Sequence, residues 1–172
     1  YTLFPYTTLF RSAMFYLPDG IAPWSDQPVW RATGLFRELH GLGAEREATV
    51  VRRLELKPVL AKRVSELSKG YRRRLLLALA LLTPQPILIL DEPFDGFDLR
   101  QTLHVMDLLR EVAAERALIL SIHQLKDAER ICDRLLLLDA GRRLGFGTLA
   151  ELAAQSGSQS GDLEEVFLGL TQ

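Results

Sequence analysis

The stretch ILILDEP, residues 87–93, decides how this sequence is interpreted. Its first four residues form a continuous apolar run, which is typical of a parallel strand that is buried on both faces. The run delivers two carboxylates, Asp91 and Glu92, to its C-terminal end, where open α/β sheets place their ligands. Asp91 is suited to hold Mg²⁺, and Glu92 is suited to polarise a water that attacks a γ-phosphate. Two solvated acids at the end of an ordinary strand are the alternative interpretation.

Two other segments carry side chains that fit the same chemistry. The segment LSKGY, residues 67–71, opens a helix just upstream of the strand. Ser68, Gly70 and the free backbone N–H groups of a helix N-terminus form an anion site. His123 closes a second apolar run, where an imidazole can reach the same edge of the sheet as Glu92. Taken singly, a serine-capped helix and a structural histidine are the more ordinary explanations.

Apolar runs and helical periodicities alternate along the chain. Strands are expected at 13–17, 87–90, 117–122 and 135–138, followed by a hairpin or edge strand between Gly141 and Gly145. Helices are expected at 29–39, 44–56, 68–82, 98–114, 125–131 and 163–170, and Thr148 can cap a further helix. This alternation predicts an α/β fold with a largely parallel sheet.

The motifs LSKGY, ILILDEP, FDGFD and SIHQ, in this order, resemble the ABC ATPase family. In that family they are the signature loop, the Walker B strand, the D-loop and the switch histidine. The resemblance runs from about Met14 to Phe167. It implies a P-loop NTPase-like ABC ATPase domain, with a partial parallel sheet and a helical signature subdomain. We expect a non-native segment at 1–12, the C-terminal part of the ATPase domain at 13–154, and a flexible tether with a short helix at 155–172.

The resemblance also implies a role for each matching residue. Asp91 would contact Mg²⁺, and Glu92 would be the catalytic base. His123 would touch the γ-phosphate of ATP. Ser68 and Gly70 would clasp the nucleotide that a partner subunit holds.

Three further positions are expected at the nucleotide or the dimer interface, and two of them depart from the family pattern. Asp98, in the D-loop, would bridge the dimer. Lys69 replaces the usual second glycine of the signature, which adds a side chain near the phosphate site. Asp19 replaces Gln or Glu in the Q-loop, the segment that couples the site to the membrane subunits, and its shorter arm reaches the metal less well. These departures bear on catalytic competence and not on the family.

The C-terminal segment narrows the subtype. LEEVFL, residues 163–168, resembles the exporter branch whose partner is an ABC-2 type permease. The implied protein is an ATP-hydrolysing motor subunit that uses ATP and Mg²⁺, pairs with itself or a sibling ATPase, and binds transmembrane permease subunits. Its expected location is cytoplasmic, on the inner face of the plasma membrane. No apolar run approaches the ~20 residues that a membrane span requires, so a partner would supply that connection.

Net charge and the arginine run argue against nucleic-acid binding. The formal net charge is −1, which gives the chain no electrostatic reason to bind a polyanion. The run at 72–74, three consecutive arginines, points in different directions around a helix, so we interpret it as a solvated face. A translation or DNA-repair ABC ATPase and a non-catalytic product are the alternative functions.

The sequence contains no G-x-x-x-x-G-K-[ST] segment, the P-loop whose amides and lysine cradle the phosphates. None of its lysines follows a glycine, and none precedes Ser or Thr. The first residues, YTLFPYTTLFRS, repeat Thr-Leu-Phe and resemble a translated sequencing adapter. We therefore expect an N-terminal truncation. The isolated chain should hydrolyse no ATP and tend to aggregate, whereas its full-length parent should be an active dimeric ATPase.

Overall fold

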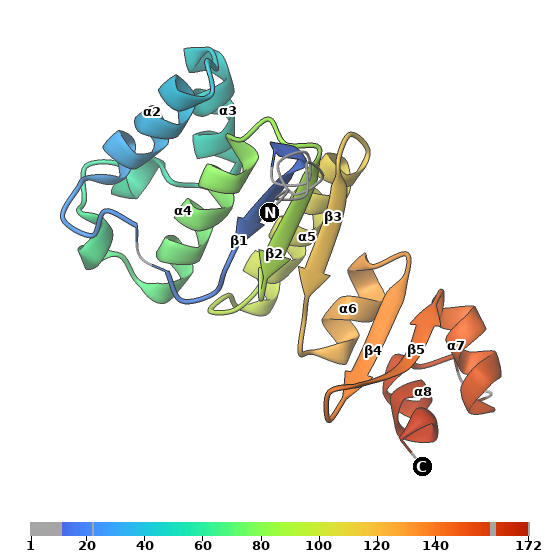
Figure 1. Ribbon diagram of the computed structural model, residues 1–172. Helices are drawn as coiled ribbons and strands as arrows, with labels where there is room; N and C mark the ends of the chain where they lie inside the picture. Colours follow the sequence, from blue (N-terminus) through green and yellow to red (C-terminus); the bar gives the residue numbers. More distant parts are fainter. Residues whose placement is uncertain (1–11, 22, 159–160, 172) are drawn as a thin grey trace, which may run out of the picture. The chain divides into compact units, whose positions relative to one another are not determined.

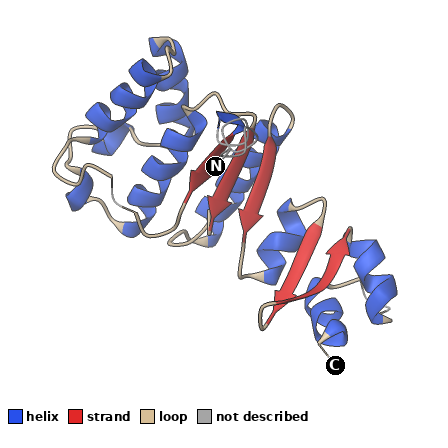
Figure 2. Ribbon diagram, in the orientation of Figure 1, coloured by secondary structure: helices blue, strands red, loops and turns tan. Residues whose placement is uncertain are grey.

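The computed structural model describes residues 12–21, 23–158 and 161–171. Most of the expected non-native segment therefore lies outside the described residues. The chain divides into two compact units, Tyr1–Ser121 and Ile122–Gln172. Figure 2 shows helices and strands alternating in both units, which confirms the predicted α/β fold. In the described part of the chain, every helix is too short or too polar to cross a bilayer.

A three-stranded parallel sheet forms the centre of the first unit. The strands β1 (Met14–Leu17), β2 (Ile87–Asp91) and β3 (Ala117–Ser121) lie side by side in that order. Because neighbouring strands run parallel, their C-terminal ends meet at one edge of the sheet. The register sets Asp91 directly beside Ser121 at this edge. The edge is where the sequence predicted the acidic side chains to gather.

Among the described residues, four helices of the first unit pack beside this sheet. They are α2 (Val29–Leu39), α3 (Ala44–Arg53), α4 (Lys69–Leu81) and α5 (Leu99–Ala113). Helix α5 connects β2 to β3, while α2, α3 and α4 form a group beside the edge strand β1 (Figure 1). The apolar run 75–82, which spans the second half of α4 and its C-cap, is buried throughout. Two short 3₁₀ turns, Lys57–Val59 and Val64–Glu66, lie between α3 and α4.

Helix α3 ends three residues earlier than its apolar periodicity predicted. Glu55 has a φ of +53°, a left-handed conformation that stops the helix. Leu54 and Leu56 on either side of it are almost completely buried. The chain therefore leaves the helix to place two leucines in the core, and full burial of each contributes roughly 1.5–3 kcal/mol.

The prediction that the apolar strand β2 is buried on both faces was wrong. Leu88 and Leu90 are buried, whereas Ile87 and Ile89 are only half-buried. The neighbouring strands show the same alternation, because their register aligns Tyr16, Ile89 and Ile119 on one face. Tyr16 is 55% exposed and Ile119 is 54% exposed. Among the described residues, helices thus cover one face of the sheet much better than the other.

The second unit is built around an antiparallel hairpin. Its elements are α6 (Leu125–Ile131), β4 (Leu135–Asp139), β5 (Arg142–Gly147), α7 (Leu149–Ser156) and α8 (Leu163–Leu170). The predicted hairpin is present, but Gly145 lies within β5 instead of at its end. Its turn has left-handed residues at Ala140 and Gly141, as a tight two-residue connection requires.

The two C-terminal helices close the core of this unit. Thr148 and Glu151 form a capping box at the start of α7, which satisfies two backbone N–H groups that would otherwise lack partners. Helix α7 continues through Ser156, two residues into the segment predicted to be a tether. Leu163 and Val166 of α8 are fully buried in the same cluster as Leu152. The predicted helix at 163–170 is confirmed at both ends.

Candidate functional site

The end of β2 places Asp91 in a group of hydrogen-bond donors. The hydroxyl of Ser121, on the adjacent strand, donates to Asp91 Oδ1. The backbone N–H of Asp19 approaches Asp91 Oδ2 from the loop after β1, at an N···O distance of 3.4 Å. A carboxylate that accepts hydrogen bonds is stabilised in its charged form. The loop after β1 therefore brings Asp19 to Asp91, and both are residues singled out in the sequence.

The same neighbours lower the pKa of Asp91. The hydrogen bond from Ser121 is the largest cause, followed by the Asp19 backbone N–H. Burial opposes the shift, whereas the positive charge of Arg73 and the hydroxyl of Tyr16 add to it. Asp91 is thus ionised well below neutral pH and can attract a cation without first losing a proton.

Replacing Ser121 with alanine should raise the pKa of Asp91 toward its ordinary value. The folded-state pKa is depressed, so this interaction stabilises the fold above the unfolded-state pKa and ceases to do so as pH falls through the folded-state value. We expect a lower thermal midpoint than wild type at neutral pH, with the difference shrinking in acid. Carboxyl ¹³C NMR of Asp91 measures the pKa, and Ser65→Ala is the control. An unchanged titration of Asp91 in Ser121→Ala would show that the hydroxyl does not stabilise the carboxylate.

Glu92 is held in an unusual backbone conformation. Its φ is +47°, in the left-handed region that non-glycine residues seldom adopt. Its N–H donates to the carbonyl of Ser121 at 3.1 Å, and its own carbonyl accepts from the Asp95 N–H at 3.1 Å. Such a conformation costs of order 1–3 kcal/mol, and this cost is concentrated at functional sites. The turn thus fixes the backbone position from which the Glu92 side chain extends, directly after Asp91.

The prediction that the run 72–74 forms a solvated face was wrong for two of its three arginines. Arg73 is 4% exposed and forms an ion pair with Asp19. Arg74 is 8% exposed and forms an ion pair with Glu55, while its guanidinium also lies near two aromatic rings. Helix α4 is packed on most of its circumference, so consecutive positions meet acidic residues of the surrounding loops. Neither buried arginine offers a surface for nucleic acid.

The signature segment forms the N-terminus of α4. Ser68 is its N-cap, and its Oγ accepts a hydrogen bond from the Tyr71 N–H at 3.3 Å. A cavity of about 330 Å³ opens here, between this helix end and the D-loop. Its lining comprises Ser68, Lys69, Gly70, Tyr71, Arg74, Gly96 and Gln101. Backbone N–H groups at such an end attract anions, and Ser68 and Gly70 both lie at this helix end.

Lys69 reaches the D-loop. Its ammonium lies 2.8 Å from Asp95 Oδ1 and 2.7 Å from Asp95 Oδ2. Gly96 has a φ of +85°, and a Cβ there would lie 2.8 Å from Lys69 Cγ. A Cβ on Gly70 would approach the Gly96 carbonyl at 3.2 Å. Both glycines therefore allow the signature segment and the D-loop to pack closely. In this contact Lys69 neutralises the carboxylate of Asp95.

Asp98 has a structural role in addition to the one expected for it. It is the N-cap of α5, and its Oδ1 accepts from the Gln101 N–H at 2.8 Å. Replacing such a cap with alanine costs about 0.5–2 kcal/mol. The sequence had already placed Asp98 at the start of a helix.

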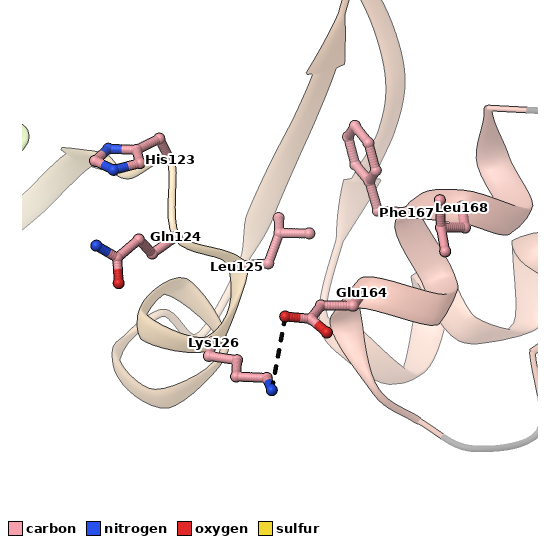
Figure 3. A pocket seen from close by; sticks show the side chains of 7 residues that line it. All are labelled: His123, Gln124, Leu125, Lys126, Glu164, Phe167 and Leu168. Carbon is pink, nitrogen blue, oxygen red and sulfur yellow. Dashed lines mark ion pairs between the residues drawn. The ribbon is translucent and has the colours of Figure 1, made fainter.

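His123 belongs to the second unit and lies two residues before the start of α6. It lines a cavity of about 500 Å³ with Gln124, Leu125, Lys126, Glu164, Phe167 and Leu168. Figure 3 shows His123 and Gln124 on the loop side and Phe167 and Leu168 on α8. Lys126 and Glu164 form an ion pair at 3.8 Å between α6 and α8. The C-terminal helix α8 thus contacts α6, the helix that follows the predicted switch histidine.

A divalent cation fits the donors at the end of β2. Across the described ranges no three His, Cys, Asp or Glu side chains cluster as a ready-made metal cage. Mg²⁺ does not require one, because it usually keeps several waters and binds one or two carboxylates together with substrate phosphates. Asp91 supplies an ionised carboxylate with a hydroxyl beside it. These donors are compatible with the predicted Mg²⁺. They would supply part of its coordination shell, and waters and phosphate oxygens would supply the rest.

Two functional neighbours were missed in the sequence, Ser121 and Arg73. The signal for Ser121 was available, since it is the last residue of the strand that precedes His123. The signal for Arg73 was hidden inside a run of three like residues, and only packing distinguishes its members.

Comparisons with known proteins agree with these motifs. The profile of the ABC transporter family matches residues 4–95. The chain is 38% identical over 139 residues to a daunorubicin resistance ATP-binding protein of Streptomyces coeruleorubidus, covering 78% of this chain and 43% of that protein. It is 39% identical over 120 residues to a thiamine import ATP-binding protein of Jannaschia sp., covering 67% and 52%.

A solved structure of the ATP-binding subunit of an ABC transporter resembles this fold. It superposes with a TM-score of 0.85 at 27% identity, over 96% of this chain and 71% of that one. The chain spans about half the length of the curated relatives that it matches.

Proposed function

This chain belongs to the ABC transporter family, and we propose that it supplies the hydrolytic carboxylates and the signature loop of an ATP-driven export motor. The observation that supports this most strongly is the arrangement at the end of β2. An ionised Asp91 and a conformationally fixed Glu92 adjoin there, at the edge where open α/β sheets bind ligands.

Asp91 and Glu92 divide the work of hydrolysis in this proposal. Asp91 would hold Mg²⁺, which neutralises charge on the phosphates when bound. Glu92 would accept the proton of the attacking water. His123 would contact the γ-phosphate.

The signature segment would serve a partner's nucleotide. Ser68 and Gly70 line the 330 Å³ cavity and present the N-terminus of α4 to an anion. Lys69 would lie beside the bound nucleotide, with its ammonium paired to Asp95, and Asp98 would contact the partner across the dimer interface. The proposed partners are a second ABC ATPase, either identical or a sibling, and transmembrane permease subunits.

Export through an ABC-2 type permease is the finer part of the proposal. The names of the relatives do not decide the direction, because one concerns daunorubicin resistance and another thiamine import. The segment at 163–168, which resembles the ABC-2 exporter branch, favours export. The proposed location is the cytoplasmic face of the plasma membrane, where such subunits meet their permeases.

A chimaera tests whether this chain supplies the second half of an ATPase. Residues 13–172 would be joined behind the P-loop segment of an established ABC ATPase, and phosphate release would be measured with and without Mg²⁺. We expect Mg²⁺-dependent hydrolysis by the chimaera and none by the 172-residue chain alone. A folded chimaera that binds ATP but does not hydrolyse it would contradict the proposal. Hydrolysis by the 172-residue chain alone would contradict the expected need for a P-loop.

A further inference from the structure

Arg73 is a buried cation that connects three separate elements. It lies in α4, its guanidinium pairs with the carboxylate of Asp19 in the Q-loop, and its Nη1 donates to the carbonyl of Asp91 at 3.2 Å. At 4% exposure the guanidinium has little access to water, so its charge depends on these partners. A guanidinium offers several donors in a fixed plane, which lets one side chain serve two acceptors on different segments.

The Q-loop residue is tied to the same place a second time. The Asp19 backbone N–H points at Asp91 Oδ2, while the Asp19 side chain holds Arg73. The next residue, Gly20, has a φ of +70°, which turns the chain away immediately afterwards. Asp19 therefore meets β2 through its backbone and α4 through its side chain.

We propose that Arg73 is a positioning residue that clamps the Q-loop against the end of β2, and that Asp19 acts by holding Arg73 rather than by binding the metal. The inference rests on the proposed function in one respect, because it takes the C-terminal end of β2 as the place where ATP is hydrolysed. It assigns a function to the Q-loop aspartate, whose side chain is short for a metal ligand. The clamp makes the Q-loop and the signature helix move as one piece.

Charge and burial favour this role over metal binding by Asp19. Turning the carboxylate of Asp19 toward a cation beside Asp91 would leave a buried guanidinium without its counter-ion, which is strongly unfavourable. Arg73 also contacts the Asp91 carbonyl and leaves both carboxylate oxygens of Asp91 to other partners. The clamp and a cation at Asp91 are therefore compatible, whereas a cation at Asp19 competes with the clamp.

Hydrogen exchange of the 172-residue chain measures the clamp directly. Arg73→Gln and Asp19→Asn should each speed amide exchange at 17–21 by about tenfold, with exchange in β2 and β3 little changed. The double variant should exchange no faster than either single variant, because each breaks the same pair. Arg73→Lys should fall between wild type and Arg73→Gln, since an ammonium keeps the Asp19 pair but reaches the Asp91 carbonyl poorly.

Controls separate a local clamp from general packing. Arg72→Gln alters the neighbouring arginine of α4 and should leave exchange at 17–21 unchanged. If Arg73→Gln unfolds the unit, Asp19→Asn decides the question, because its side chain is 44% exposed. Unchanged exchange in Asp19→Asn, or additive effects in the double variant, would overturn the clamp.

A titration with Mg²⁺ separates the two roles of Asp19. Addition of Mg²⁺ should leave exchange at 17–21 unchanged in wild type and in Asp19→Asn. Protection that depends on both Mg²⁺ and Asp19 would assign the metal to Asp19 and overturn the clamp. No hydrolysis is measured, so failure here leaves the proposed ATPase function standing, and failure of the chimaera leaves the clamp standing.

Discussion

Glu92→Gln should lower ATP hydrolysis by the P-loop chimaera at least about 100-fold, the lower end of what a positioned general base contributes. The amide keeps the size of the side chain and its hydrogen-bonding reach, but it cannot accept the proton of the attacking water. The left-handed backbone at Glu92 is set by hydrogen bonds of its main chain, so the substitution leaves the turn intact. Steady-state phosphate release, measured at saturating ATP and Mg²⁺, gives the ratio.

Binding of ATP distinguishes lost chemistry from lost structure in this variant. Equilibrium binding of a fluorescent ATP analogue should be unchanged or tighter, since removing a negative charge beside the phosphates lowers repulsion. Glu115→Gln, an exposed acid after α5, is the matched control and should hydrolyse ATP like the parent. Retention of more than a third of the activity by Glu92→Gln would remove Glu92 from the role of base.

The sequence predicted the elements well where local rules decide them. Ser68, Asp98 and Thr148 each lie one residue before a helix, and each accepts a hydrogen bond from its first turn. Such caps depend on nearby residues alone, so they are visible without a structure. The parallel arrangement of apolar runs that end in polar residues likewise placed Asp91 at the correct edge.

The sequence failed where contacts between distant segments decide the outcome. The burial of Arg73 depends on Asp19, 54 residues away in the chain, and no local pattern distinguishes it from Arg72. The contact of Lys69 with Asp95 arises because two glycines let the signature segment and the D-loop approach. The open face around Ile119 depends on which helices lie over the sheet. These features follow from packing, which periodicity does not encode.

The C-terminal segment has one feature that the local pattern predicts and one that depends on contacts with distant segments. Its amphipathic pattern was sufficient to predict the helix at 163–170, because apolar positions recur at helical spacing. The partner of its apolar face was not predictable, and the structure shows it to be the core of the second unit. The backbone N–H of Leu163 also donates to Glu129 Oε2 at 3.1 Å, which attaches the start of α8 to α6. The segment that resembles the ABC-2 exporter branch is therefore also the support of the helix that follows His123.

Leu163→Ala should lower the stability of the second unit by about 2–5 kcal/mol, the usual cost of removing a fully buried leucine side chain. The cavity would form between α8 and the hairpin, so amides of β4 and α6 should exchange about 30-fold faster or more. Leu168→Ala in the same helix is the control, because Leu168 is 61% exposed and its loss should change stability by less than about 0.5 kcal/mol. Native-state hydrogen exchange measures both variants and reports the first unit separately. Equal effects of the two substitutions, or no effect of Leu163→Ala on β4, would show that α8 does not stabilise this unit. Its proposed support of α6, the helix that follows His123, would then be wrong.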